Sequence, residues 1–219
     1  MANAPLICIC IPSAGMVHME FVERMYGPLR YVPVEWATKK VGIARTGNVT
    51  VARNSLVELA MQSGADYLLW VDDDAVPEDP ADPNQALKML VDTGLDIVGA
   101  LYPAKRSTGI EPGAFMDADE LPPAGRKHQN LLPIVPEGDA PMPVDGTGMH
   151  FLLTSRRVFE DMRPPWFVWD EPGALSEDFY FLDRAAARGF HAHVHPKVKV
   201  SHIGTVKITS DMRMVSMSV

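Results

Sequence analysis

The sequence predicts a single α/β domain built on a doubly wound sheet, and three observations support this prediction. Apolar runs of strand length alternate with amphipathic segments of helical spacing through residues 1–101. One of these runs, residues 67–71, leads directly into three carboxylates, Asp72-Asp73-Asp74. A chain of 219 residues, 47% hydrophobic and 22% charged, is long enough to bury one sizeable core.

The first half of the chain carries the alternation of strands and helices that defines this class. Apolar or alternating runs predict strands at residues 5–11, 31–37, 67–71 and 95–101. Apolar residues at helical spacing predict helices at residues 17–25, 51–61 and 84–91. Thr50 is the expected N-cap of the second helix, and Gly64 follows its end.

The second half is irregular at first and then resumes the same alternation. Residues 102–143 are dense in proline and glycine, which favours short antiparallel strands and a mobile loop that closes over a site. Beyond them we expect strands at residues 149–153, 190–194 and 198–202, and helices at residues 156–162 and 177–187. Ser176 is the expected N-cap of the last helix, and the tail after Gly204 is expected to be weakly structured.

Charge and cysteine content limit the possible partners and compartment. The formal net charge of −8 argues against a general polyanion-binding surface, so duplex nucleic acid is a disfavoured partner. Cys8 and Cys10 lie two residues apart on a strand, where they point the same way but are poorly placed to bond to each other. We therefore expect buried free thiols and a cytoplasmic protein, because neither a signal segment nor an apolar membrane span is visible.

The acidic triplet follows a predicted buried strand, at the edge of an open α/β sheet where ligands bind. On an extended segment, Asp72 and Asp74 project to the same side, whereas Asp73 faces the other way and is expected to be structural. A hard divalent cation, completed by substrate phosphates and water, would offset the repulsion between these carboxylates. The alternative interpretation is a solvated acidic turn or a helix N-cap.

Other polar motifs have both a functional and a structural interpretation. Glu177-Asp178 begins a helix, where acids interact favourably with the helix dipole, but a carboxylate there can also act as a general base. His202, at a strand end, is either structural or a ligand for a Mn²⁺-class ion. His191, His193 and His195 alternate, which indicates an exposed strand face more strongly than a zinc site.

Two further motifs concern ligand approach. Gly146-Thr147-Gly148 would let a ligand come close to the backbone, although it does not match the dinucleotide-binding fingerprint. Arg53 and Lys105-Arg106 are candidate contacts for a phosphate or a base, and the alternative for each is ordinary surface charge.

The order of these motifs resembles GT-A-fold glycosyltransferases, particularly the family 2-like group, over residues 5–205. Ala52-Arg53-Asn54 and the run that ends in Asp72-Asp73-Asp74 are similar to the donor-binding half. The segment from Gly146 to Phe159 resembles the acceptor side, and Ser176-Glu177-Asp178 resembles the family's glutamate–aspartate helix, except that many relatives have glycine in place of Ser176. The segment 198–204, which contains His202, is similar to the closing histidine motif.

The resemblance implies a GT-A-like, Rossmann-like domain with a mixed, mostly parallel central sheet flanked by helices. Residues 1–101 would bind the nucleotide sugar, residues 102–205 would form the acceptor and catalytic half, and residues 206–219 would be a flexible tail. It also implies roles for particular residues. The metal would be held by Asp72, Asp74 and His202, and Asp72 would also contact the donor ribose. The base would be Asp178, with Glu177 beside it. The nucleoside would be surrounded by Pro12, Ser13 and Arg53, and the diphosphate would be reached by Lys207.

The expected function is therefore a hexosyltransferase-type glycosyltransferase that depends on Mn²⁺ or Mg²⁺. It would move a sugar from a nucleotide-diphosphate sugar, with a UDP-sugar favoured, to a hydroxyl of a glycan, protein or nucleobase acceptor, and inversion is favoured on family grounds. The alternatives are a nucleotidyltransferase and a non-catalytic protein that binds nucleotide sugars.

Overall fold

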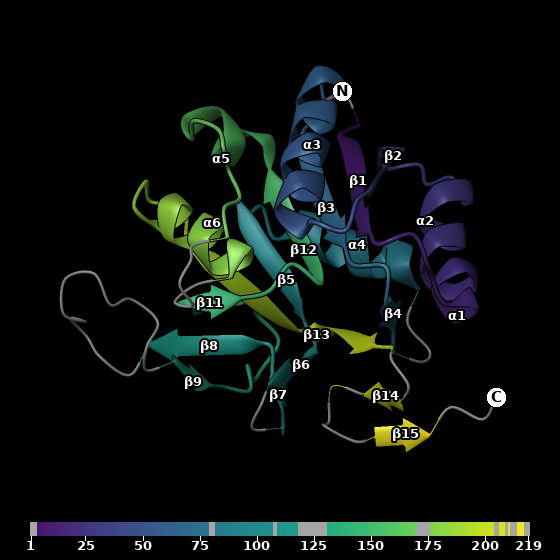
Figure 1. Cartoon of the computed structure of the whole chain (residues 1–219), viewed down its shortest axis with the longest axis vertical. Helices are drawn as coiled ribbons and strands as arrows, with labels where there is room; N and C mark the ends of the chain where they lie inside the picture. The colour runs from purple at the N-terminus through teal and green to yellow at the C-terminus, as the bar shows by residue number, and fades with distance from the viewer. Residues whose placement is uncertain are drawn as a thin grey trace.

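The computed structural model describes residues 4–78, 82–106, 109–117, 131–169, 176–203, 206–208, 210 and 214–216. These residues form a single mixed α/β domain whose large central sheet is flanked by helices (Figure 1). Among them, no helix is long and apolar enough to cross a membrane.

The central sheet consists mainly of parallel strands, with one reversed strand in its middle and a short antiparallel pair of strands at one edge. Its order is β15-β14-β13-β5-β12-β3-β1-β2. The bounds are β1 (Leu6–Ser13), β2 (Thr38–Arg45), β3 (Tyr67–Val71), β5 (Ile97–Leu101), β12 (Phe151–Ser155), β13 (Ala192–His202), β14 (Val206–Ile208) and β15 (Met214–Ser216). β1 is parallel to β2 and β3, and β13 is parallel to β5, whereas β12 is antiparallel to both β3 and β5. The start of β12 therefore lies at the same sheet edge as the ends of β3 and β5.

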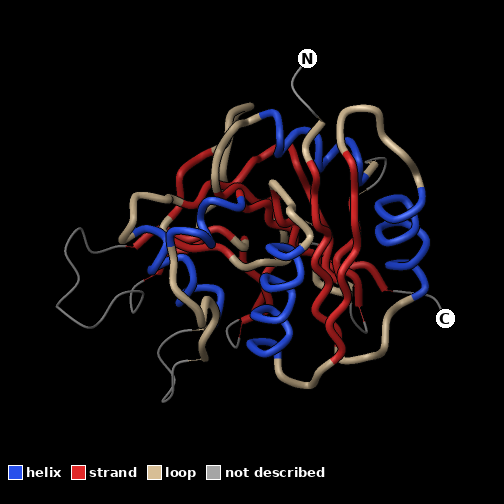
Figure 2. The backbone as a smooth tube through the Cα atoms, turned by 90° about the horizontal axis from the view of Figure 1, so that it is seen from above, coloured by secondary structure: helices blue, strands red, loops and turns tan. Residues whose placement is uncertain are grey.

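Helices cover both faces of the sheet (Figure 2). The helices α3 (Val49–Gln62), α5 (Arg156–Asp161) and α6 (Glu177–Ala186) pack on one face, and α1 (Met19–Phe21), η1 (Val22–Tyr26), α2 (Gly27–Tyr31) and α4 (Pro83–Asp92) pack on the other. Successive side chains of a strand point to opposite faces, so Cys8 and Cys10 belong to the first layer while Ile7 and Ile9 belong to the second. Both cysteines are buried and free, as predicted.

Residues 102–147 add short antiparallel strands beside the sheet, as their composition indicated. β6 (Pro103–Arg106) pairs with β7 (Gly109–Pro112), and β8 (Ala114–Asp117) pairs with both β9 (Leu131–Pro133) and β11 (Gly146–Thr147). β10 (Met142–Val144) joins β13. We also expected, within residues 102–143, a mobile loop that closes over a site; residues 118–130 of this segment lie outside the described residues, so that expectation stays a prediction.

One predicted strand is wrong. Residues 31–37 were expected to be extended, but α2 continues to Tyr31 and the second strand is β2, at Thr38–Arg45. β2 is an edge strand with several exposed side chains and two lysines, of which Lys40 is exposed and Lys39 is half-buried, so its sequence lacks the apolar run that would identify it. The alternating Val34 and Trp36 instead pack partly buried against the α2–α4 layer.

Other boundaries also shifted for local reasons. Asn48, rather than Thr50, is the N-cap of α3, and its Oδ1 accepts hydrogen bonds from the backbone N–H groups of Thr50 and Val51. The two strands expected at residues 190–194 and 198–202 form one strand, β13, with a register shift between His195 and Lys199. Pro196 lies within that irregularity and lacks the N–H group that regular pairing requires. The tail after Gly204, expected to be weakly structured, contains β14 and β15.

Candidate functional site

The acidic triplet forms a turn at the end of β3. The N–H of Ala75 donates to the carbonyl of Asp72 at 3.0 Å, and the chain then enters β4 (Ala75–Pro77), which pairs with β13. The expected extended geometry is therefore wrong, because a turn rather than a strand places these side chains. Asp72 and Asp74 nonetheless both face His150.

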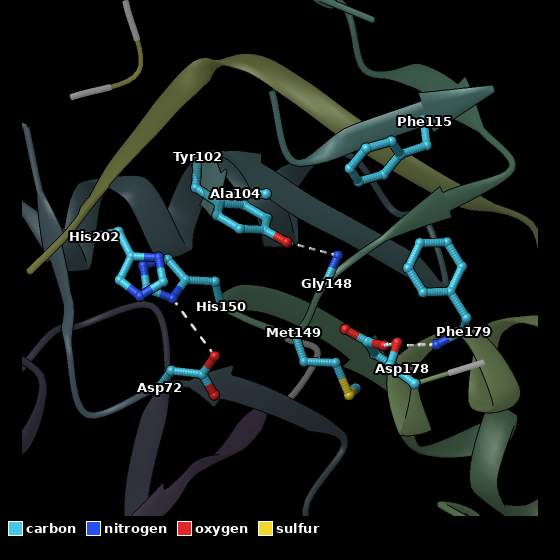
Figure 3. A pocket seen from close by; sticks show the side chains of 11 residues that line it. Asp72, Tyr102, Ala104, Phe115, Gly148, Met149, His150, Asp178, Phe179 and His202 are labelled. Atoms are coloured by element: carbon cyan, nitrogen blue, oxygen red, sulfur yellow. Dashed lines mark hydrogen bonds and ion pairs between the residues drawn. The ribbon is translucent and has the colours of Figure 1, made fainter. Parts of the chain in front are cut away.

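His150 is the residue of the candidate site that sequence reasoning missed. It precedes β12, and because β12 is reversed, the residue lies beside the acidic turn: the N–H of Asp72 donates to the His150 carbonyl at 3.2 Å. Its ring is 2% exposed and packs against Tyr102 and His202, with ring centroids 4.9 and 4.6 Å away (Figure 3). A polar residue at the start of an otherwise apolar strand was the available signal, but it identifies a site only once the strand direction is known.

Three side chains from different elements can hold a metal ion together. Asp74, His150 and His202 each offer a ligand atom, and these atoms lie within 4.8 Å of one another. Nε2 of His202 is 2.7 Å from Oδ2 of Asp74, and Nδ1 of His150 is 3.6 Å from Oδ1 of Asp74. The structure thus brings together Asp74 and His202, which the sequence proposed as ligands, and adds a second imidazole.

The electrostatics of this cluster favour carboxylates that stay charged at neutral pH. Burial alone would raise the pKa of Asp72, but the charge of Arg53 and the contact with His150 lower it overall. Burial would likewise raise the pKa of Asp74, but the hydrogen bond from His202 outweighs this effect. The pKa of Asp74 therefore also lies below its ordinary value. The two carboxylates also raise the pKa of the buried His150 against the effect of its burial, so the pair favours positive charge beside it, as a proton on the histidine or as an added cation.

Arg53 connects the acidic turn to α6. Its side chain is 4% exposed; Nη2 lies 3.2 Å from Oδ1 of Asp72, and Nη1 pairs with Oε1 of Glu177. The guanidinium lies over the ring of Phe167, 5.9 Å from its centroid. Arg53 does line the cavity where a nucleoside was expected, but its charge is already matched by two carboxylates.

The two acids at the start of α6 differ in their surroundings. Glu177 is buried against Arg53, and burial raises its pKa above the ordinary value despite the arginine charge. Oδ1 of Asp178 accepts hydrogen bonds from the hydroxyl of Ser176 and, at 2.9 Å, from the N–H of Phe179. Ser176 occupies the N-cap position as predicted, but its hydroxyl donates to Asp178 and does not cap the helix.

Two cavities meet at these residues. The larger, of about 480 Å³, is lined by the end of β1, the loop before α3, the acidic turn and the start of α6; Pro12, Ser13 and Arg53 are among its walls. The smaller, of about 260 Å³, is lined by Tyr102, Phe115, Gly148, Met149, His150 and Phe179, among others (Figure 3). Both cavities share four residues, Asp72, Ser176, Asp178 and His202.

The prediction that Asp73 faces away from Asp72 and Asp74 is wrong. Asp73 lines the larger cavity together with Ser13, and burial raises its pKa while the hydrogen bond with Ser13 opposes that change. The turn geometry explains the difference, because alternation of side chains applies only to extended backbone.

The remaining candidates have simpler outcomes. His191 is exposed, His193 is half-buried, and Nδ1 of His195 accepts a hydrogen bond from the N–H of Lys197 at 3.2 Å, so these histidines do not gather as a zinc site. Lys207 lies in β14 and Lys105-Arg106 lie in β6, but their side chains fall outside what the structure describes.

Gly146 and Gly148 make room for aromatic side chains rather than for a ligand at the backbone. A Cβ atom on Gly146 would lie 2.1 Å from the ring of Phe179, and one on Gly148 would lie 2.2 Å from the hydroxyl of Tyr102. The N–H of Gly148 donates to that hydroxyl at 2.9 Å. These glycines therefore let two aromatic residues form the wall of the smaller cavity.

Comparisons with known proteins establish the class of fold. The crystal structure of A197 from STIV is similar to this chain, with a TM-score of 0.62 and 17% sequence identity over 98% of this chain and 95% of that chain. A nucleoside-diphosphate-sugar pyrophosphorylase from Vibrio cholerae RC9 is a more distant match, with a TM-score of 0.40 and 12% identity over 86% of this chain and 91% of that chain. No protein-family model and no curated protein matches the sequence. The first similarity supports a Rossmann-like α/β fold, as predicted.

Proposed function

We propose that the protein is a metal-dependent glycosyltransferase that uses a nucleotide-diphosphate sugar, with a UDP-sugar favoured. The observation that carries this proposal is the position of the acidic turn and its histidines, at the junction of two cavities. Such a junction suits a reaction in which one substrate loses a charged group and the other supplies a nucleophile. The edge that carries it is where ligands bind in open α/β sheets.

The larger cavity suits the donor. Its volume, about 480 Å³, falls in the range typical of small-molecule sites, and its walls combine residues from the end of β1 with carboxylates. A divalent cation held by Asp74 and His202, with Asp72 beside them, would neutralise charge that develops on the departing diphosphate.

The smaller cavity suits the acceptor, and Asp178 is the base that serves it. One of its carboxylate oxygens, Oδ1, is held by Ser176 and by the N–H of Phe179. The other, Oδ2, lies toward Gly148, since a Cβ atom placed there would be 3.2 Å away. An acceptor hydroxyl in this cavity would give its proton to Asp178 while its oxygen attacks the anomeric carbon and the bond to the diphosphate breaks.

Glu177 has a different role in this scheme. Its carboxylate is paired with Arg53 inside the protein, so it fixes the start of α6 instead of receiving the acceptor proton. We therefore assign the base function to Asp178 alone, and treat Glu177 and Arg53 as positioning residues.

The test is to incubate the protein with UDP-sugars, Mn²⁺ and a panel of hydroxyl acceptors, and to identify the nucleotide product. Release of UDP that is lost in Asp178→Asn, but kept in the control Asp161→Asn on the surface of α5, is the expected result. Formation of UTP from UDP-sugar and pyrophosphate would instead identify a nucleotidyltransferase. Binding of UDP-sugars with no product across the panel would identify a non-catalytic binding protein.

A further inference from the structure

We propose that His150 is a ligand of the metal ion, and that the set Asp74, His150 and His202 makes the site prefer first-row transition ions over Mg²⁺. This inference deepens the proposed function and rests on it for the role of the ion, but metal binding itself is measurable without any donor. The second imidazole is what distinguishes this set from a site built on carboxylates alone.

The hydrogen bonding of His150 prepares one of its nitrogens to bind a metal. Nε2 lies 3.1 Å from the carbonyl oxygen of Ser201. A carbonyl can only accept, so Nε2 donates its proton to Ser201, and Nδ1 is the nitrogen that would bind an ion in place of a proton. Metal-binding histidines are usually oriented in this way, by donating their other ring N–H to a carbonyl or carboxylate.

Nδ1 of His150 points into the cluster at a distance that suits an intervening ion. It lies 3.6 Å from Oδ1 of Asp74, the carboxylate of the proposed ligand set. A direct charge-assisted hydrogen bond would be shorter, about 2.7–2.9 Å. Two ligand atoms bound to one ion at about 2.1 Å are about 3.0 Å apart at a right angle and about 3.4 Å apart in a tetrahedron.

The ring is also held in place by its neighbours. His150 is 2% exposed, and its ring lies between those of Tyr102 and His202 at interplanar angles of 31° and 30° (Figure 3). A buried imidazole fixed on its faces and at one nitrogen needs little reorganisation to bind an ion at the other nitrogen.

Asp72 is set apart from this ligand set by Arg53. Its Oδ1 accepts a hydrogen bond from the guanidinium at 3.2 Å, which commits one oxygen of that carboxylate. The remaining set is two imidazole nitrogens and one carboxylate of Asp74. Mg²⁺ is bound through oxygen ligands and water, whereas imidazole suits transition ions, so this composition disfavours Mg²⁺.

The discriminating variant is His150→Gln. The glutamine amide places a donor near the position of Nε2 and can keep the bond to Ser201, but it removes Nδ1. Mn²⁺ titration followed by electron paramagnetic resonance, with no nucleotide present, should show at least a tenfold loss of affinity in His150→Gln. His193→Gln, on β13 away from the cluster, is the matched control and should bind Mn²⁺ as the wild type does.

A second measurement counts the ligands directly and needs no variant. Pulsed electron paramagnetic resonance of the Mn²⁺-loaded wild type, with ¹⁵N-labelled histidine, should detect two coupled imidazole nitrogens, and His150→Gln should show one. Mg²⁺ should need at least a tenfold higher concentration than Co²⁺ to displace Mn²⁺ from the wild type.

Three results would overturn the proposal: a single coupled nitrogen in the wild type, unchanged Mn²⁺ affinity in a folded His150→Gln variant, or displacement by Mg²⁺ as easily as by Co²⁺. Failure of the proposed function is a separate outcome. A protein that binds Mn²⁺ through two histidines but transfers no sugar would keep this inference and reject that function.

Discussion

Arg53 shows how much a single buried side chain can determine at this site. Its guanidinium pairs with Asp72 in the acidic turn after β3 and with Glu177, the first residue of α6. Glu177 lies 124 residues beyond Arg53 along the chain. Breaking a buried ion pair by removing one partner is costly, because the other charge is left without compensation. Replacing Arg53 with an apolar residue should therefore destabilise the protein, because Glu177 and Asp72 would lose their counter-charge.

We predict that Arg53→Met lowers the free energy of unfolding by about 3–5 kcal/mol, because Glu177 loses its counter-charge in a buried setting. Urea unfolding measures this change, with the exposed Arg45→Met as a control that should change it by less than about 1 kcal/mol. Adding Glu177→Leu to Arg53→Met should recover part of the loss. A change no larger than that of the control would mean that the pair contributes nothing.

A second prediction at the residue scale concerns His195. Burial lowers the pKa of this histidine, and its Nδ1 accepts a hydrogen bond from the N–H of Lys197, which requires the neutral ring. Between the lowered folded value and the unfolded value of about 6.5, the unfolded chain binds more protons than the native protein. Because of His195, the free energy of unfolding decreases as the pH falls below about 6.5. This decrease is complete once the pH is below the pKa of the folded state.

His195→Asn keeps an acceptor near the position of Nδ1 and removes the titration. It should flatten the dependence of the free energy of unfolding on pH between about pH 7 and pH 5. The exposed His191→Asn serves as the control and should keep the wild-type slope. Equal slopes for the wild type and His195→Asn would contradict this account.

At the scale of elements, the segment around β11 shows why small residues lie next to aromatic ones. Gly148 lies against Tyr102 and Gly146 against Phe179, so the smaller cavity keeps its shape only while these positions lack side chains. We predict that Gly148→Ala reduces transfer activity at least tenfold, because its Cβ atom would displace the Tyr102 hydroxyl.

Adding Tyr102→Phe to Gly148→Ala removes the clashing oxygen and should restore part of the activity. Gly47→Ala is the matched control: Gly47 lines the larger cavity, but a Cβ atom there meets nothing within 4 Å. Steady-state kinetics with a fixed donor would measure both effects. If the double variant recovers no activity, the loss in Gly148→Ala does not come from the clash with the Tyr102 hydroxyl.

The elements also show which features the sequence could reveal. β3 was predictable because Leu68 to Val71 are all buried and therefore apolar, and α6 because its buried residues follow helical spacing. β2 was not, because an edge strand carries little apolar pattern. His150 was missed for a different reason: its neighbours come from β3 and β13, and strand order is not a local property of the sequence.

At the scale of the whole molecule, the site is assembled by topology. Parallel strands bring the ends of β1, β3 and β13 to one edge, and the reversed β12 adds its beginning there. The order of motifs along the chain indicated most members of this assembly. The contact between Arg53 and Glu177 became visible only in three dimensions, and the structure shows at Asp72-Asp73-Asp74 the turn that the sequence offered only as an alternative.

Ligand binding to the native state should stabilise the whole domain. We predict that Mn²⁺ at about 100 times its dissociation constant raises the free energy of unfolding by about 2.7 kcal/mol, and that a UDP-sugar adds to this only when metal is present. Thermal unfolding with and without a chelator measures both effects, and Asp74→Asn should abolish them. Equal stabilisation by the sugar nucleotide in chelator would contradict a shared metal–diphosphate site.

The irregularity in β13 has a consequence for insertions and deletions. Beyond the register shift between His195 and Lys199, the strand presents the carbonyl of Ser201 to His150 and the ring of His202 to Asp74. Side chains alternate along a strand, so a shift of one residue would exchange the faces on which these groups lie. A gain or loss of one residue at Pro196 would thus leave a strand that still pairs but no longer brings His202 to Asp74. We expect the length of this short segment to be under tighter constraint than its composition.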